Sequence, residues 1–205
     1  MGKIILITGG ARSGKSTYAE KLAKEENGKV LYVATSIPFD EEMRERVKKH
    51  RERRPSNWDT FEGYKNLKDI FSNPRLDFDV VLLDCITIMV TNLLFEKTGE
   101  NIESFSEEKL NGIEGGILKE VADFIDEAEK TTKTIILVTD EVGFGIVPEY
   151  KSARVFRDIA GRVNQYIAKR SKEVSLVVCG IQVKVKWGRY EGFYFDASIF
   201  YKAAY

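Results

Sequence analysis

The sequence of 205 residues has little of several features that direct proteins to particular functions. It holds one histidine and two cysteines, and its 32 basic residues equal its 32 acidic residues in number. A balanced charge gives no reason to expect nucleic acid or an anionic membrane as a partner. No apolar run approaches the length of a membrane span. The hydrophobic content of 43% is ordinary for a folded protein, so we expect one domain over residues 1–205.

The two cysteines and the N-terminal residues indicate in which cellular compartment the protein works. Cys85 and Cys179 lie in or just beyond apolar strand-like runs and lack the spacing of metal ligands, so we expect two reduced, buried thiols. The first strand-like run begins after Lys3, which leaves no room for a signal peptide. The N-myristoylation pattern has Ser or Thr at position 6, where this chain has Leu6. These features predict a cytoplasmic protein.

Five short, almost continuously apolar runs are typical of strands in a parallel sheet that is covered on both faces. They are Ile4–Thr8, Val30–Ala34, Val80–Asp84, Thr134–Thr139 and Val174–Cys179. Helix-like segments alternate with them: Ser16–Glu26, Asp40–Arg54, Ile86–Glu96, Glu107–Lys130 and Arg154–Arg170. This alternation predicts an α/β fold with its ligands at the carboxyl ends of the strands. Residues 97–108 are expected to form a loop. The aromatic segment 187–205 is either an extra edge strand or a surface buried against another subunit.

The clearest motif follows the first predicted strand. It has the P-loop form G-x-x-x-x-G-K-S and consists of Gly9, Gly10, Ala11, Arg12, Ser13, Gly14, Lys15 and Ser16. Its glycines let backbone N–H groups turn toward an anion, and the following helix adds its positive end. Lys15 and Ser16 are placed to reach the outer phosphates and a Mg²⁺ ion. The motif therefore predicts binding of a nucleoside triphosphate.

Acidic residues end two of the predicted strands. Asp84 ends a strand that we expect to neighbour the P-loop strand, and there it would hold the Mg²⁺ that Ser16 also binds. The alternative is that Asp84 is an ordinary strand-end residue or the N-cap of the helix near Ile86. Asp140 and Glu141 follow another strand and place two more acids at the same edge.

The single histidine, His50, lies in a predicted helix that begins at Asp40 and ends before Pro55. Seven basic residues stand against two acidic ones between positions 44 and 54, which makes a concentrated anion site in a neutral protein. Imidazole is a good neutral nucleophile near pH 7, and the surrounding arginines would hold phosphates. The alternative is that His50 covers the apolar side of a solvated helix whose bases only complement its dipole.

Several segments together resemble the bifunctional adenosylcobinamide kinase / adenosylcobinamide-phosphate guanylyltransferase family of cobalamin biosynthesis. The resemblance covers most of residues 3–186, and its most specific part is H-R-x-x-R-P followed by W-x-T-x-E. The segments are TGGARSGKS (8–16), LYVATS (31–36), DEEMRERVKKHRERRPSNWDTFE (40–62), LLDCITIMVTNLL (82–94), VTDEVGFGIVPEYKSARVFRDIAGRVNQ (138–165) and LVVCGI (176–181).

The resemblance implies a RecA-like P-loop fold and two activities. One phosphorylates the hydroxyl of the aminopropanol arm of adenosylcobinamide with ATP or GTP. The other transfers GMP from GTP to that phosphate through a guanylyl-histidine on His50, with Lys15 and Mg²⁺ assisting. The resemblance also implies a homo-oligomer such as a trimer. The nucleotide-contacting positions that it implies beyond the P-loop are Ala34, Thr35, Ser36, Arg51, Glu52, Arg53, Arg54, Glu62 and Asp84.

The chain departs from the family pattern at two places. Many members resemble T-N-E-V-G where this chain has Asp140 in T-D-E-V-G, which adds a negative charge close to the expected phosphate site. The aromatic segment after Lys186 extends beyond the shared part.

Three rival functions use the same P-loop. A small-molecule or nucleoside-monophosphate kinase would leave His50 idle. A switch GTPase is disfavoured because its N-K-x-D segment is absent, and a cassette-type transport ATPase because L-S-G-G-Q is absent.

Overall fold

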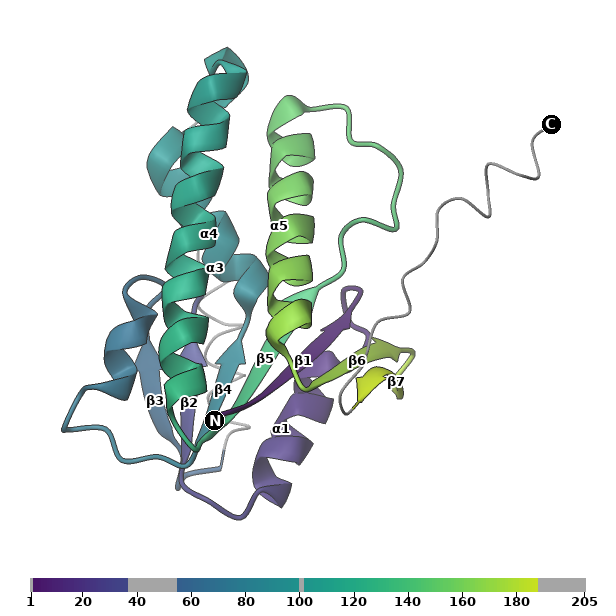
Figure 1. The fold of residues 1–205 in the computed structure, drawn as a ribbon. Helices are drawn as coiled ribbons and strands as arrows, with labels where there is room; N and C mark the ends of the chain where they lie inside the picture. Colours follow the sequence, from purple (N-terminus) through teal and green to yellow (C-terminus); the bar gives the residue numbers. More distant parts are fainter. Residues whose placement is uncertain (1, 37–54, 100–101, 188–205) are drawn as a thin grey trace.

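The computed structural model describes residues 2–36, 55–99 and 102–187. Within them a seven-stranded sheet runs in the order β3-β2-β4-β5-β1-β6-β7 (Figure 1). All neighbouring strands are parallel except β6 and β7, which are antiparallel. The strands are β1 Lys3–Gly9, β2 Val30–Ala34, β3 Asp59–Glu62, β4 Val80–Asp84, β5 Thr134–Asp140, β6 Glu173–Val178 and β7 Ile181–Trp187. The predicted, mostly parallel sheet is confirmed.

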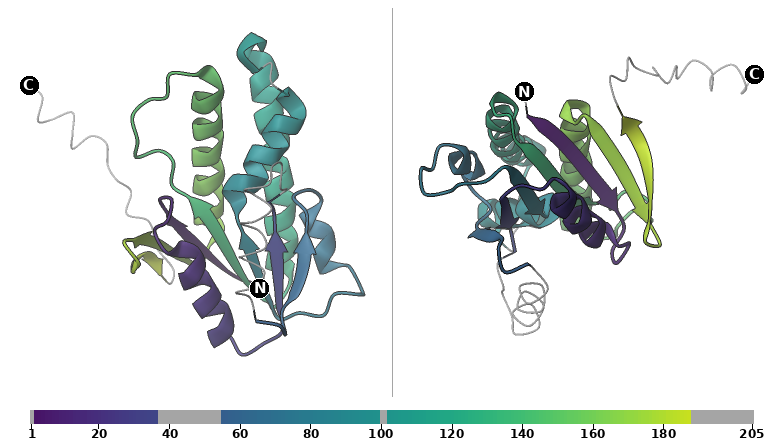
Figure 2. Two further views of the ribbon diagram at one scale, coloured as in Figure 1. Left: turned by 180° about the vertical axis from the view of Figure 1, so that it is seen from behind. Right: turned by 90° about the horizontal axis from the view of Figure 1, so that it is seen from below.

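Helices cover both faces of the sheet, α1 on one face and α3, α4 and α5 on the other (Figures 1 and 2). The α-helices are α1 Lys15–Glu25, α3 Ile86–Thr98, α4 Glu107–Lys130 and α5 Lys151–Arg170, and two short 3₁₀ helices are η1 Leu67–Phe71 and η2 Ile102–Ser104. Helix α4 begins where it does because the hydroxyl of Ser106 accepts a hydrogen bond from the Lys109 N–H at 3.3 Å. In the described parts of the chain, none of the helices is long and apolar enough to cross a bilayer.

The core consists of two apolar layers, one on each side of the sheet. Side chains alternate along a strand, so Ile4 and Leu6 of β1 face the layer beneath α3, α4 and α5. Ile5 and Ile7 face the other layer, which Ala19 of α1 completes. All of these side chains are fully buried. This burial on two faces explains why the strands are continuously apolar rather than alternating.

The structure differs from the sequence-based expectation at the edges of the sheet. The apolar pattern does not predict β3, because this edge strand has only four residues and three of them are exposed. The strand at the opposite edge, β7, ends at Trp187 instead of beginning there, because Ile181, Val183 and Val185 alternate with polar residues. The predicted helix Asp40–Arg54 and residues 188–205 lie outside the described residues. Helix α5 begins at Lys151, three residues before the predicted start.

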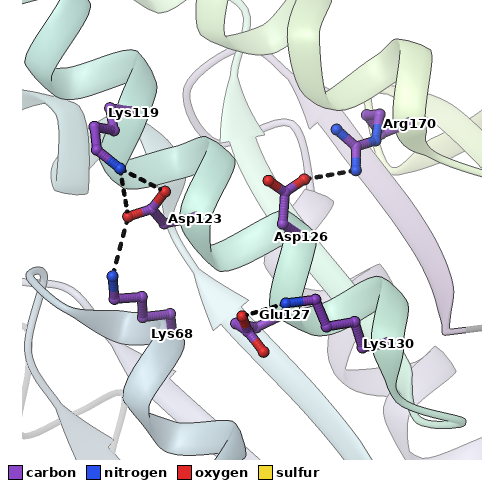
Figure 3. A network of polar contacts seen from close by, with 7 residues as sticks. All are labelled: Lys68, Lys119, Asp123, Asp126, Glu127, Lys130 and Arg170. Carbon is purple, nitrogen blue, oxygen red and sulfur yellow. Dashed lines mark hydrogen bonds and ion pairs between the residues drawn. The ribbon is translucent and has the colours of Figure 1, made fainter.

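Charged side chains tie α4 to its neighbours on both sides (Figure 3). Asp123 accepts hydrogen bonds from Lys119, one turn away, at 2.9 and 3.0 Å, and from Lys68 of η1 at 3.1 Å. Asp126 forms an ion pair with Arg170 at the end of α5, with a nitrogen–oxygen distance of 2.7 Å. Solvent screens these contacts, so they orient α4 more than they stabilise the fold.

The centre of α4 yields a test of the packing. Phe124 is fully buried and its ring lies 5.4 Å from the ring of Phe71. We expect Phe124→Ala to lower the free energy of unfolding by about 3–5 kcal/mol, because it leaves a cavity in the larger apolar layer. Urea denaturation followed by circular dichroism measures the change. Phe95→Ala removes an aromatic ring that is 58% exposed, so it is the matched control and should change stability little. Equal losses for the two variants would contradict this description of the core.

Candidate active site

The carboxyl end of β1 turns into α1 through the glycine-rich loop 9–16. Arg12 and Gly14 have positive φ angles of 56° and 98°, which bring successive backbone N–H groups to one side of the loop. An added Cβ at Gly14 would also lie only 3.2 Å from the Cα of Gly180. The Gly180 N–H in turn donates to the Ser13 carbonyl at 2.8 Å and anchors the loop to the β6–β7 turn. The backbone thus has the concave form that binds anions.

Two side chains of this loop point to an anionic ligand. The Oγ of Ser13 is buried and has no hydrogen-bond partner among the described residues. A buried hydroxyl without a partner is costly, and a phosphate oxygen would satisfy it. Lys15, the first residue of α1, is also buried, and its ammonium donates to the Gly10 carbonyl at 3.1 Å.

The charge of Lys15 is balanced by Asp140, the last residue of β5. Lys15 Nζ and Asp140 Oδ1 lie 2.5 Å apart. Gly9 and Asp140 are register partners in the sheet, and the Glu141 N–H donates to the Gly9 carbonyl at 3.1 Å. The expectation that Asp140 lies close to the phosphate loop is therefore confirmed. Any triphosphate that binds Lys15 has to compete with this carboxylate.

The sheet order corrects one expectation about Asp84. We expected β4 to neighbour the P-loop strand, but β5 lies between β1 and β4. Asp84 is half-buried at the end of β4, and its Oδ2 accepts a hydrogen bond from the Tyr32 hydroxyl at 3.1 Å. The N-cap of α3 is Cys85, so Asp84 does not cap that helix. Asp84 thus points its carboxylate to the same edge as Asp140, one strand further from the P-loop.

The strand register places three of the expected residues, Ala34, Glu62 and Asp84, side by side. Ala34 is the partner of both Glu62 on β3 and Asp84 on β4, so these residues form one row across three strand ends. Thr35 follows Ala34 and is fully buried. Its hydroxyl donates to the Cys85 carbonyl at 2.8 Å and accepts from the Cys85 N–H at 3.0 Å. Thr35 therefore joins the ends of β2 and β4, and Ser36 is the last described residue before the gap.

The two cysteines differ in their surroundings. Cys85 is buried, as expected, and its burial raises the pKa of the thiol to about 12, to which the charges of Asp84 and Asp140 add. Cys179 is exposed in the β6–β7 turn, which corrects the expectation of two buried thiols. The reason is that the turn lies past the end of the apolar strand β6, so no apolar side chains cover Cys179.

A group of polar side chains that the sequence pattern does not reveal fixes the end of β5. The Thr87 hydroxyl accepts from the Asp140 N–H at 2.6 Å. Asn164 of α5 donates to the Asp140 carbonyl at 3.1 Å and accepts from the Thr139 hydroxyl at 2.7 Å. Because α3 and α5 both hold the backbone of Asp140, its carboxylate is directed at Lys15. The only signal in the sequence is that Thr87 and Asn164 are polar positions within apolar helix faces.

The remaining expected residues are not placed by the structure. His50, Arg51, Glu52, Arg53 and Arg54 lie outside the described residues, as does the rest of their predicted helix. Trp58 is the nearest described aromatic residue after the gap, and its ring stacks on Tyr32 at 6.5 Å between centroids. Tyr32 in turn donates to Asp84. The chain therefore re-enters the fold beside the acidic end of β4.

The sheet is mostly parallel, its strand β1 leads into a P-loop, and β5 lies between β1 and β4. These features define a P-loop nucleotide-binding protein. The fold is similar to a solved structure described as a prototypical ATPase from the type III secretion system of pathogenic bacteria, with a TM-score of 0.56. That likeness, at 10% identity over 89% of this chain and 56% of the ATPase chain, concerns the fold alone. Residues 5–185 match the family described as cobinamide kinase / cobinamide phosphate guanyltransferase, so the chain belongs to that family.

Three curated relatives agree with the family match. The bifunctional adenosylcobalamin biosynthesis protein CobU of Escherichia coli and that of Salmonella typhimurium are each 46% identical over 183 residues, which is 89% of this chain and 99% of each relative. The bifunctional protein CobP of Pseudomonas aeruginosa is 35% identical over 88% of this chain and 96% of its own length.

The Lys15–Asp140 ion pair yields a prediction about nucleotide affinity. We expect Asp140→Asn to bind GTP about tenfold more tightly in EDTA, because the carboxylate no longer competes for Lys15 or repels the phosphates. Asparagine keeps the size of the side chain and leaves the backbone contacts to Thr87 and Asn164 in place. Equilibrium dialysis with labelled GTP measures the affinity. The control for net charge is Asp69→Asn, an exposed position in η1. An unchanged or weaker affinity in the Asp140 variant alone would contradict the prediction.

Proposed function

We propose that this chain phosphorylates adenosylcobinamide and then transfers GMP from GTP to adenosylcobinamide phosphate, giving adenosylcobinamide-GDP and pyrophosphate. The observation that carries this proposal is membership of the cobinamide kinase / cobinamide phosphate guanyltransferase family over residues 5–185. It is supported by the retention of both chemical parts in one chain, the P-loop and the single histidine within H-R-x-x-R-P. A plain kinase would need only the first part.

In the kinase step, we propose that the loop 9–16 holds the triphosphate and that the arm hydroxyl of adenosylcobinamide attacks the γ-phosphorus. A new oxygen–phosphorus bond forms, the bond from the γ-phosphorus to the β,γ-bridging oxygen breaks, the nucleoside diphosphate leaves, and the hydroxyl proton passes to water. Lys15 leaves Asp140 and binds the outer phosphates, where its ammonium offsets the charge that builds up on the leaving oxygen. The Ser13 hydroxyl, buried and without a partner among the described residues, donates to a phosphate oxygen. Asp140 stays fixed by Thr87 and Asn164 beside the vacated position of Lys15.

In the guanylyl step, we propose that the neutral imidazole of His50 attacks the α-phosphorus of GTP. A nitrogen–phosphorus bond forms, the bond from the α-phosphorus to the bridging oxygen breaks, and pyrophosphate leaves. A phosphate oxygen of adenosylcobinamide phosphate then attacks the same phosphorus and releases His50. Arg51, Arg53 and Arg54 would neutralise the phosphates during both transfers. We further propose that one triphosphate cradle, the loop 9–16, serves both reactions.

The residues present fit a Mg²⁺ ion that is shared with the nucleotide. We propose Ser16 in the first turn of α1 and Asp84 at the end of β4 as its protein ligands. The carboxylate of Asp84 is half-buried, faces the catalytic edge and is oriented by the Tyr32 hydroxyl. The described residues contain no cluster of three or more His, Cys, Asp or Glu ligands. Proteins bind Mg²⁺ through one or two side chains together with phosphates and water. Bound there, the ion supplies charge neutralisation on the phosphates.

We also propose that the protein forms a homo-oligomer, and that a trimer is the form to test. The support is a row of apolar side chains on the outer strand β7, all exposed in the single chain: Ile181, Val183, Val185 and Trp187. Contiguous exposed apolar surface of this kind marks contacts with other chains.

The guanylyl step is tested by His50→Ala. We expect the wild-type protein incubated with α-labelled GTP to retain acid-labile, base-stable label, and the variant to retain none, because the chain has no second histidine. The variant should still bind GTP in equilibrium dialysis and still phosphorylate adenosylcobinamide, which serves as the internal control for folding. Label that accumulated on the variant would refute the histidine mechanism. An unlabelled wild-type protein that phosphorylates adenosylcobinamide would favour the plain kinase.

A further inference from the structure

An apolar cavity of about 470 Å³ lies away from the phosphate loop, between the last turns of α3, helix η2 and the first turns of α5. Its floor belongs to the core, since Leu94 and Ile102 are buried. Its rim is exposed, since the ring of Phe95 is 58% accessible. Its polar lining residues are Thr91, Thr98, Glu103 and Ser152. Small-molecule sites have this size and this composition, mostly apolar with a few polar groups.

Polar contacts between protein groups join two walls of the cavity. Lys151 at the start of α5 donates to the carbonyls of Glu103 and Phe105 at 3.2 and 2.8 Å. The Ser152 N–H donates to the Glu103 carboxylate at 3.0 Å. These bonds join η2 to the first turn of α5, so the two walls keep their separation. A preformed cavity loses less conformational freedom when it takes up a ligand.

The position of the cavity relative to the catalytic edge follows from α5. Asn164 of this helix contacts Thr139 and the Asp140 carbonyl, which places it level with the strand end beside Lys15. Phe156 lines the cavity and lies eight residues nearer the start of α5, which is about 12 Å along the helix axis. The cavity is therefore set back from the phosphates by roughly that distance, along the helix that also fixes Asp140.

The segment that joins the catalytic edge to the cavity is itself apolar and exposed. Residues 141–150 leave the end of β5 and run alongside α5 to its first turn (Figure 1). Phe144 and Ile146 in this segment are 83% and 92% exposed, and Val147 and Tyr150 are also exposed. Apolar side chains at this density on a loop usually serve contact with another molecule. The loop begins at the strand end beside Lys15 and ends at the first turn of α5, where Ser152 and Ala153 line the cavity.

This arrangement fits the geometry of the substrate in the proposed function, on which the inference rests. Adenosylcobinamide carries its reactive hydroxyl at the end of a flexible arm, while the corrin ring is a bulky macrocycle with apolar faces and an amide-bearing rim. The hydroxyl has to reach the γ-phosphorus, so the ring has to lie away from the phosphates against an apolar surface. Thr91 and Ser152 offer hydrogen bonds to rim amides. We propose that the cavity and the loop 141–150 bind the corrin ring, with one edge of the ring in the cavity.

Phe95→Ala tests this assignment. Because Phe95 is exposed, the variant should fold, bind GTP and label itself with GMP as the wild type does. We expect its KM for adenosylcobinamide in the kinase reaction to rise about tenfold with kcat little changed, since the variant loses apolar contact with the ring. Equilibrium dialysis with adenosylcobinamide alone should show the same loss. Arg75→Ala removes a long exposed side chain before β4, outside the cavity, the P-loop and the apolar row of β7, so it is the control and should leave KM unchanged.

Three outcomes separate the possibilities. A raised KM with an unchanged sedimentation coefficient supports the corrin site. An unchanged KM, or a rise that comes with a lower sedimentation coefficient, overturns it, and the second result assigns this surface to contact between copies of the chain. A wild-type protein that labels itself with GMP but neither binds nor phosphorylates adenosylcobinamide overturns the proposed function, which is a separate result from failure of the corrin site.

Discussion

The contact between the Lys15 ammonium and the Asp140 carboxylate joins the phosphate loop to the strand beside it. The two residues lie far apart in the sequence but meet in space because β5 pairs directly with β1, with Asp140 opposite Gly9. Without a counter-charge, the buried ammonium of Lys15 would be costly. Asp140 supplies that charge, and a bound triphosphate would compete with it for Lys15. Hydrogen bonds with Thr87 and Asn164 fix the backbone of Asp140. The turn of the glycine-rich loop fixes Lys15, so the ammonium and the carboxylate stay in contact.

Asp84 at the end of β4 and Asp140 at the end of β5 have different roles in the proposed reactions. Asp140 faces Lys15 directly, whereas Asp84 lies one strand further away and is oriented by the Tyr32 hydroxyl. In the proposed function, a phosphate bound between them would meet the Lys15 ammonium on one side and Asp84, the proposed Mg²⁺ ligand, on the other. Trp58 stacks on Tyr32 and brings the chain back to this edge after the His50 segment.

Much of this arrangement could be predicted from the sequence, and the rest could not for definite physical reasons. Continuous apolar runs predicted five strands correctly, because burial on both faces leaves a strong signal. The edge strand β3 leaves none, since its four residues are mostly exposed. Strand order is also hidden, so Asp84 was expected beside the P-loop strand when β5 lies there instead. The roles of Thr87, Thr139 and Asn164 depend on contacts across three elements, which no spacing along the chain reveals.

The central claim is that one triphosphate cradle serves both proposed reactions. The most direct test uses β,γ-methylene ATP, which occupies a P-loop but transfers neither its γ-phosphate nor GMP. Its inhibition constant should be measured against GTP both in self-labelling of the protein and in phosphorylation of adenosylcobinamide with GTP as the donor. We predict competitive inhibition with the same constant in both reactions. Constants that differ severalfold, or inhibition that is not competitive in one reaction, would show two nucleotide sites and contradict the claim.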